Sequence, residues 1–153
     1  SLLVVSKINN EFLKKTNSRE KDILIAEKRM GVYKKAFYKK FLNRIISYKK
    51  KLHLRLSNLK KEGKQIAGYG ASHSSTLLVH QFDLNKYLNF IVDDNEIKHY
   101  TFSPNFKIPV LPSKKIYTEK IKNVILLAWN KKKYIIKKHK RFTKNKGKFL
   151  LPF

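Results

Sequence analysis

Hydrophobic residues in the first part of the chain follow a strand pattern and then a helical one. Residues 2–5 form an apolar run typical of a strand, and residues 18–30 have the polar start of a short helix that ends at Gly31. From 32 to 61, apolar residues recur at steps of three to five positions with Lys and Arg between them, which predicts a long amphipathic helix. At about 1.5 Å per residue this helix would span roughly 45 Å, so we expect it to pack against more than its own sheet.

After Gly63 the pattern changes to short apolar runs that alternate with helical segments. The predicted strands are 66–70, 87–92, 108–110, 124–129 and 149–151, and the predicted helices are 72–82 and 131–142, with Tyr134, Ile135 and Ile136 on the inner face of the second helix. Continuous apolar strands between helices indicate the α/β class, with a parallel sheet covered by helices on both faces. Right-handed crossovers would place strand 66–70 centrally, between strands 87–92 and 124–129.

Length and composition are those of one ordinary domain. The chain has 153 residues, of which 42% are hydrophobic, enough to bury a core. The sequence has no Cys, which excludes disulfides, thiol nucleophiles and thiolate zinc sites. No run approaches the roughly 18 apolar residues of a membrane span, so we expect a soluble, cytoplasmic protein without a membrane partner. Because the first residue is Ser1 and not Met, we expect the chain to begin inside a larger protein.

The net charge of +26 raises the question of an anionic partner. Only five of the 36 basic residues are Arg, whose planar guanidinium binds phosphates and bases bidentately. A Lys-dominated excess therefore favours a solvated surface over a nucleic-acid interface. The alternative that remains open is a basic module that grips nucleic acid through the helix 32–61 and the segment 131–141.

The strongest local signal is the glycine turn after the first of these strands. Residues 68–76 leave a buried strand and enter a helix, so backbone N–H groups and the helix dipole would point at an anion in the turn. The candidate binding residues are Gly68, Tyr69, Gly70, Ala71, Ser72, His73, Ser74 and Ser75. Glycines would allow close backbone approach and Ser hydroxyls could bind phosphate oxygens. The alternative is structural, in which Gly70 makes a tight turn and Ser72 caps the helix.

Two further strand ends point to the same edge of the sheet. Asp93, with Asp94 and Asn95, ends the next strand about 23 positions past Gly70, where dinucleotide-binding folds place the acid that holds a ribose. Trp129 and Asn130 end the strand on the other side and could line the same crevice. The third glycine of the dinucleotide fingerprint would fall at His73, which weakens an NAD site. A polar turn at Asp93 and a core position for Trp129 are the structural alternatives.

No self-contained active site is predicted. The five His residues show no metal-ligand spacing, so no metal is expected. His73 lies at the glycine turn and could act as a base or bind phosphate, or be an exposed loop residue. Asp93 and Asp94 are adjacent and would point apart, so they do not form a proton-sharing pair.

Several motifs in order resemble one family. They are Gly63 to Ser72 (GKQIAGYGAS), Thr76-Leu-Leu, Phe90 to Asn95 (FIVDDN) with Lys98, Tyr100 to Pro104 (YTFSP), Ile108-Pro-Val and Val124 to Asn130 (VILLAWN). This series is similar to the C-terminal, Rossmann-like domain of bacterial S-adenosylmethionine-dependent C-methyltransferases, which methylate a carbon of a nucleotide-linked deoxysugar. The resemblance covers residues 32–153, and 1–31 would be the end of a preceding domain or a linker.

The resemblance implies a role for this chain as part of a longer enzyme. The family has an N-terminal zinc-binding region and a central methyltransferase domain, so the S-adenosylmethionine site and the catalytic His would lie upstream, and this chain alone should be inactive and hold no cofactor. It implies that the turn from Gly68 to Ser75 faces the diphosphate of the sugar nucleotide, with Asp93, Lys98, Trp129 and Asn130 near the shared cleft. Ser74-Ser75 stand where the family often has Lys-Gly, and Pro104-Asn105 where it often has Pro-Gly. The Lys that is lost there would have been a phosphate cation.

Overall fold

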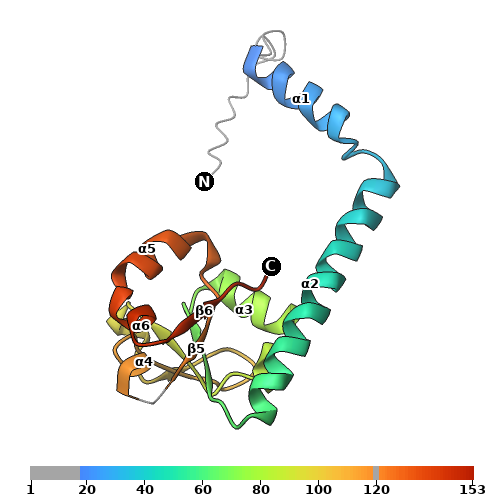
Figure 1. Ribbon diagram of the computed structural model, residues 1–153. Helices are drawn as coiled ribbons and strands as arrows, with labels where there is room; N and C mark the ends of the chain where they lie inside the picture. Colours follow the sequence, from blue (N-terminus) through green and yellow to red (C-terminus); the bar gives the residue numbers. More distant parts are fainter. Residues whose placement is uncertain (1–17, 119–120) are drawn as a thin grey trace. The chain divides into compact units, whose positions relative to one another are not determined.

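The computed structural model describes residues 18–118 and 121–153, and the chain divides into two compact units between Ile45 and Ile46. The predicted strand at 2–5 lies outside the described residues. The boundary predicted at 31/32 stays a prediction. Each unit is described by itself, and Figure 1 gives the labels of the elements.

The first unit holds helix α1 (Ser18–Met30) and the start of helix α2 (Lys35–Lys61), which continues into the second unit. Both helices confirm the periodicity of the sequence. Gly31 ends α1 with a φ of +74°, a left-handed conformation that glycine adopts without steric cost. Its N–H donates to the carbonyls of Glu27 and Lys28, both at 3.0 Å, which satisfies carbonyl groups at the end of the helix.

The second unit is built on a six-stranded sheet in the order β3-β4-β2-β1-β5-β6. The strands are β1 (Ile66–Tyr69), β2 (Phe90–Asp93), β3 (Thr101–Phe102), β4 (Pro109–Pro112), β5 (Asn123–Leu126) and β6 (Lys148–Leu150). All neighbouring pairs are parallel except β3 with β4. The predicted central position of the first strand is confirmed, since β1 pairs with β2 on one side and with β5 on the other. The short antiparallel strand β3 was not predicted.

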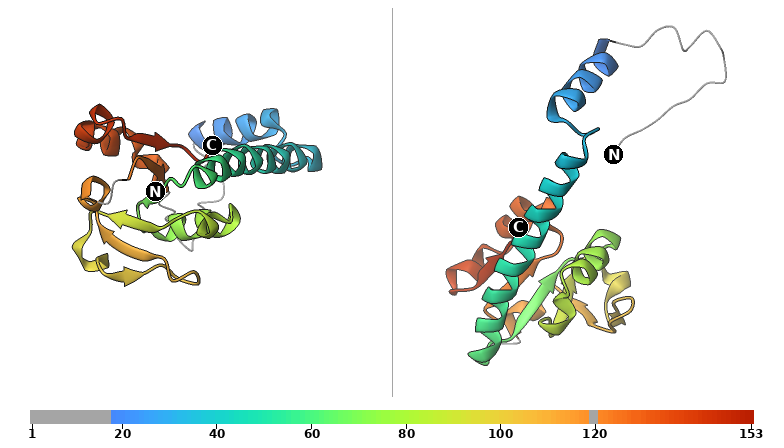
Figure 2. Two further views of the ribbon diagram at one scale, coloured as in Figure 1. Left: turned by 60° about the horizontal axis from the view of Figure 1, so that its bottom comes forward. Right: turned by 90° about the vertical axis from the view of Figure 1, so that its right-hand side faces the viewer.

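Helices cover the two faces of this sheet, as the right-hand view of Figure 2 shows for α3 and for the paired α5 and α6. The helices are α3 (His73–Gln81), α4 (Lys115–Thr118), α5 (Lys132–Lys138) and α6 (Lys140–Lys144), with short 3-10 turns at Leu84–Lys86, Glu96–Lys98 and Trp129–Lys131. The second unit is therefore α/β with a mixed, mainly parallel sheet.

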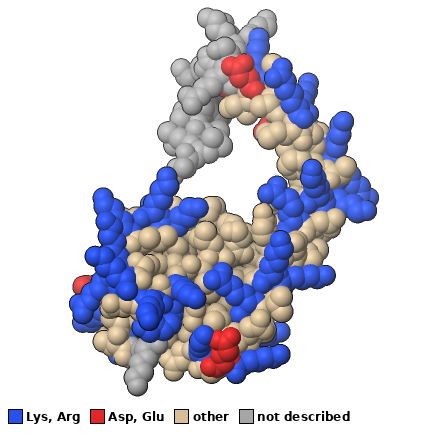
Figure 3. All heavy atoms as spheres, in the orientation of Figure 1, with Lys and Arg blue, Asp and Glu red and all other residues tan. Residues whose placement is uncertain are grey.

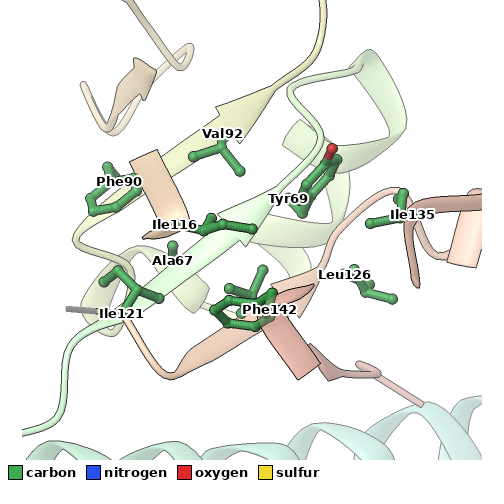
Figure 4. Packing of buried hydrophobic residues seen from close by; sticks show 10 residues of the cluster. Ala67, Tyr69, Phe90, Val92, Ile116, Ile121, Leu126, Ile135 and Phe142 are labelled. Atoms are coloured by element: carbon green, nitrogen blue, oxygen red, sulfur yellow. The ribbon is translucent and has the colours of Figure 1, made fainter. Parts of the chain in front are cut away.

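The core on the α4–α6 side is formed by alternate residues of the central strands, because successive strand side chains point to opposite faces. Tyr69, Val92 and Leu126 from three strands pack with Ile135 of α5 and Phe142 of α6 (Figure 4). Leu126 and Val92 are fully buried. The C-terminal ends of strands β1, β2 and β5 therefore pack on this apolar layer, which holds the carboxyl edge of the sheet rigid.

Within the second unit, helix α2 packs through apolar contacts, a hydrogen bond and an ion pair. Leu52 and Leu56 are buried. The Nε2–H of His53 donates to the Phe82 carbonyl at 2.6 Å, and Lys49 forms an ion pair with Asp83 at 2.6 Å. The helix therefore packs beside the C-terminal end of α3.

Several predicted boundaries are wrong, and the largest error concerns 131–142. This segment is two helices, because His139 has φ −106° and ψ 36°, which is not helical, and its ring turns into the interior. Of the predicted inner face only Ile135 is buried, while Tyr134 and Ile136 are exposed. Strand β5 ends at Leu126, so Trp129 lies in a 3-10 turn and not in a strand.

Candidate ligand-binding site at the carboxyl ends of the strands

Strand β1 lies where the chain connections run to opposite sides of the sheet. The connection through α3 leads to β2, whereas the chain reaches β5 on the other side only after β4 and α4. The Gly70 N–H donates to the Val92 carbonyl at 2.7 Å, and the Ala128 N–H donates to the Tyr69 carbonyl at 3.0 Å. Backbone bonds therefore hold together the ends of three strands at the crevice where α/β proteins bind ligands.

The conformation and packing of the chain require a glycine at position 70. Its φ is +102°, and a Cβ at this position would lie 2.6 Å from the Cβ of Ala128. The side of Gly70 that lacks a Cβ thus faces the segment after β5. The glycine turn does not fit a cofactor, such as NAD or S-adenosylmethionine, that needs close approach over this glycine.

Asp93, at the end of β2, binds the turn. Its Oδ2 accepts the Ala71 N–H at 2.6 Å, and its Oδ1 accepts the Asn95 N–H at 2.8 Å. The Nζ of Lys98 lies 3.6 Å from the same Oδ2. One amide of the predicted anion site is therefore taken by a carboxylate of the chain.

The Ser side chains at the start of α3 bind one another. Ser72 is the N-cap, and its Oγ accepts the Ser75 N–H at 3.3 Å. The same oxygen lies 3.0 Å from the Oγ of Ser74 and 2.8 Å from that of Ser75. His73 is exposed at the first position of the helix. The capping role, considered as the alternative, is thus present in the structure.

Asp94 points to the opposite side of the turn and joins a chain of hydrogen bonds. The Tyr69 hydroxyl lies 3.0 Å from both carboxylate oxygens of Asp94 and 2.7 Å from Nε2 of His139. The Nδ1 of His139 lies 2.8 Å from the Tyr117 hydroxyl, and Lys138 forms an ion pair with Asp94 at 2.7 Å. Five side chains from β1, α4, α5 and the two connecting segments therefore meet beneath the strand ends.

The direction of each bond follows from the donors present. A carboxylate can only accept, so the Tyr69 O–H donates to Asp94 and its oxygen must accept from His139. His139 then carries its proton on Nε2, and its bare Nδ1 accepts from Tyr117. The chain runs from Tyr117 through His139 and Tyr69 to Asp94, and every bond in it points the same way.

The pKa values agree with this assignment. Burial lowers the pKa of His139 below its usual value, which favours the neutral ring. Burial acts to raise the pKa of Asp94, but hydrogen bonds from Lys138, Ser113 and Tyr69 outweigh it and hold the pKa below its usual range. Burial, together with the charge of Asp94, raises the pKa of the Tyr69 phenol far above its usual value. At neutral pH the site therefore has an ionised Asp94 beside a neutral phenol and a neutral imidazole.

A pocket of about 390 Å³ opens above this chain of bonds. We call it the carboxylate pocket, and it is lined by Tyr69, Gly70, Asp93, Asp94, Ala128, Lys131, Tyr134 and Ile135. A groove of about 500 Å³ adjoins it and shares Lys131 and Tyr134. We call it the aromatic groove, and its other lining residues are Trp129, Asn130, Lys132, Lys133, Leu151 and Phe153.

A third pocket of about 160 Å³ lies on the α3 side of the sheet. Val79 of α3 and Ile91 of β2 form part of its wall, and Phe102, Phe106 and Lys98 close it. Ala71 and Ser75 also line it. The glycine turn thus separates this small pocket from the carboxylate pocket.

The structure distributes the predicted site residues over these three spaces. Tyr69, Gly70 and Asp93 line the carboxylate pocket, and Trp129 and Asn130 line the aromatic groove. Ala71, Ser75 and Lys98 line the small pocket. Gly68 is buried, and a Cβ there would lie 2.6 Å from Cδ1 of Leu127, so this glycine serves packing.

Sequence reasoning missed Asp94, Tyr117, Lys131, Tyr134 and His139. Asp94 was predicted at the strand end beside Asp93 and pointing away from it, without a binding role, and Tyr134 was predicted on the inner face of a helix. The bonds of His139 depend on residues 69, 94 and 117, which are far apart in the sequence. The local sequence signal for His139 was its position among Lys137, Lys138 and Lys140.

A comparison with known proteins identifies the family of this chain. Residues 1–153 match the family described as C-methyltransferase C-terminal domain, and the chain belongs to this family. It is 26% identical over 132 residues to the C-methyltransferase NovU of Streptomyces niveus. The match covers 86% of this chain and 31% of NovU, so the chain spans about a third of that relative. The predicted resemblance is confirmed.

The chain is also similar to a solved structure. It is the crystal structure of UDP-D-quinovosamine 4-dehydrogenase from Vibrio fischeri, at 21% identity and a TM-score of 0.42. The superposition covers 57% of this chain and 76% of the dehydrogenase chain.

Two further features are absent from residues 18–118 and 121–153. No helix there is long and apolar enough to cross a membrane. Nor do three or more His, Asp or Glu side chains of this range come together as they would around a metal ion.

Proposed function

We propose that this chain is the part of a sugar C-methyltransferase that binds the nucleotide-linked sugar. The carboxylate pocket and the aromatic groove carry the proposal, because they adjoin at the carboxyl edge of the sheet and combine carboxylates, lysines and aromatic rings. Sugar nucleotides offer hydroxyls, phosphates and a planar base to these same groups. Membership of the C-methyltransferase C-terminal domain family supports the assignment.

The methyl donor and the catalytic base belong, in this proposal, to other parts of a longer enzyme. S-adenosylmethionine would supply the methyl group there. This chain would contribute binding energy that holds the sugar for the reaction. The predicted contacts of Ser72, His73 and Ser74 with phosphate stay predictions.

The test is a thermal-shift titration of residues 1–153 with thymidine diphosphate, a thymidine diphosphate sugar, S-adenosylmethionine, NAD and a DNA oligomer at physiological salt. A ligand at 100 times its Kd stabilises the folded state by about 2.7 kcal/mol. Trp129, the only Trp of the chain, gives a second readout by fluorescence because it lines the aromatic groove. We expect saturable stabilisation by the two thymidine nucleotides alone.

Matched variants make the test specific. Lys131→Gln removes a cation that both pockets share, and Lys144→Gln removes an exposed one that lines neither. Only the first should weaken binding. Equal binding by both variants, or a response to S-adenosylmethionine instead, would contradict the proposal.

The second candidate is nucleic-acid binding, favoured by the net charge of +26. Figure 3 shows Lys and Arg side chains spread around the face in view instead of gathering at one place. A response to DNA alone, which falls steeply with salt, would establish this candidate in place of the first.

A further inference from the structure

The carboxylate pocket and the aromatic groove are neighbours that share two lining residues and differ in the charges that line them. They share Lys131 and Tyr134, so a ligand can lie across both. Asp93 and Asp94 stand in the carboxylate pocket, while Lys132 and Lys133 stand in the aromatic groove. The carboxylates therefore line one pocket, and these two lysines line only the other.

The cations of the groove are available to a ligand. Among the described residues, the ammonium groups of Lys131, Lys132 and Lys133 have no hydrogen bond or ion pair within the protein, in contrast to Lys138 with Asp94. A phosphate is attracted to this end and repelled by the carboxylates at the other.

Aromatic side chains stand beside these cations. Trp129 is 45% exposed and Phe153 is 47% exposed, with ring centroids 5.1 Å apart and planes at 70°. Exposed rings next to cations suit a planar base, which stacks on an aromatic face while its phosphates meet the lysines.

The carboxylate pocket suits the opposite end of such a ligand. Asp94 is ionised and oriented by Tyr69, so its oxygens accept hydrogen bonds from hydroxyl groups. Tyr134, which is 61% exposed, offers a ring face between the two ends. The Asp94 side chain is 33% exposed and that of Asp93 is 13% exposed, so Asp94 is the more accessible acceptor.

We propose that a nucleotide-linked sugar lies across both pockets with its base on Trp129 and Phe153, its phosphates beside Lys131 and the hydroxyls of its sugar on Asp94. This inference rests on the proposed function and adds the direction of the ligand. Tyr69 and His139 are then positioning residues that hold the carboxylate of Asp94.

Two half-ligands test the direction by calorimetry. Thymidine diphosphate carries the base and phosphates, and glucose 1-phosphate carries the hydroxyl-rich ring and a phosphate. Trp129→Ala should weaken thymidine diphosphate about 10-fold or more and leave glucose 1-phosphate unchanged, because stacking concerns the base alone. Asp94→Asn should weaken glucose 1-phosphate about 10-fold and leave thymidine diphosphate unchanged, or slightly improve it.

Control variants match each change. Tyr38→Ala removes an aromatic ring that is 58% exposed and lines none of the three pockets, and Glu96→Gln neutralises an exposed acid near Asp94. Both should bind like the wild type. Lys131→Gln, on an exposed side chain, should weaken both half-ligands, and it serves if Asp94→Asn disturbs folding.

The outcomes separate this inference from the proposed function. Binding of the full sugar nucleotide by the wild type, with the two half-ligand effects exchanged or equal in Trp129→Ala and Asp94→Asn, would overturn the direction and leave the function standing. Failure of the wild type to bind the full sugar nucleotide would overturn both.

Discussion

Replacing Tyr69 by Phe removes one oxygen atom from the middle of the chain of hydrogen bonds that links Tyr117, His139 and Asp94. The ring keeps its packing, so the change isolates the hydroxyl. The Nε2–H of His139, a residue that is 4% exposed, then has no acceptor at 2.7 Å. Asp94 also loses a donor but keeps Lys138 at 2.7 Å.

The loss is dominated by the orphaned imidazole donor. A buried polar group without a partner costs about 1–3 kcal/mol. We therefore expect Tyr69→Phe to lower the free energy of unfolding by about 2 kcal/mol. With a slope of about 2 kcal/mol per molar urea, the unfolding midpoint should fall by about 1 M.

Tyr117→Phe is the matched comparison. Tyr117 is 39% exposed, so water can reach the Nδ1 of His139 in place of the lost hydroxyl. This variant should lose less than about 1 kcal/mol. Equal losses in the two variants, or a Tyr69→Phe midpoint within error of the wild type, would refute the directed chain of bonds.

Three other predictions follow from the same edge of the sheet. The folded-state pKa of His139 lies below the usual 6.5 and that of Asp94 below 3.8, so the unfolded chain binds protons more readily and stability should fall as pH drops through 6.5 and again near 4. Urea midpoints from pH 7.5 to 5 should show this slope, and His139→Gln should flatten it; an unchanged slope in the variant would exclude His139 as its source. Gly70→Ala should destabilise far more than Gly63→Ala, because both have positive φ but only Gly70 has a neighbour within 4 Å of the added Cβ. Since the nearest neighbour is the Cβ of Ala128, adding Ala128→Gly should restore part of the thermal stability, whereas no recovery would place the cost in the backbone conformation and in the contact with the Ala128 backbone.

The order of elements could be predicted because it depends on local patterns. The helix α2 and the central place of β1 followed from periodicity and from the handedness of crossovers. Membership of the family followed from motifs in series. These signals all lie within short windows of sequence.

The site could be predicted only in part, because its chemistry depends on contacts between distant residues. A helical pattern over 131–142 gives no sign that His139 breaks the helix to reach Tyr69. Asp93 was expected near a ligand, and its bond to Ala71 depends on the exact approach of β2 to the turn. The spacing of residue types predicts neither the helix break at His139 nor the bond between Asp93 and Ala71.

The bond between Asp93 and Ala71 has a consequence for the evolution of this turn. A carboxylate on the same chain competes with any dissolved anion at a very high effective concentration, because no translational freedom is lost when it binds. In this protein the Asp93 carboxylate therefore occupies the Ala71 amide and excludes an anion from solution. The substitution Asp93→Gly would therefore free the Ala71 amide for an anion from solution.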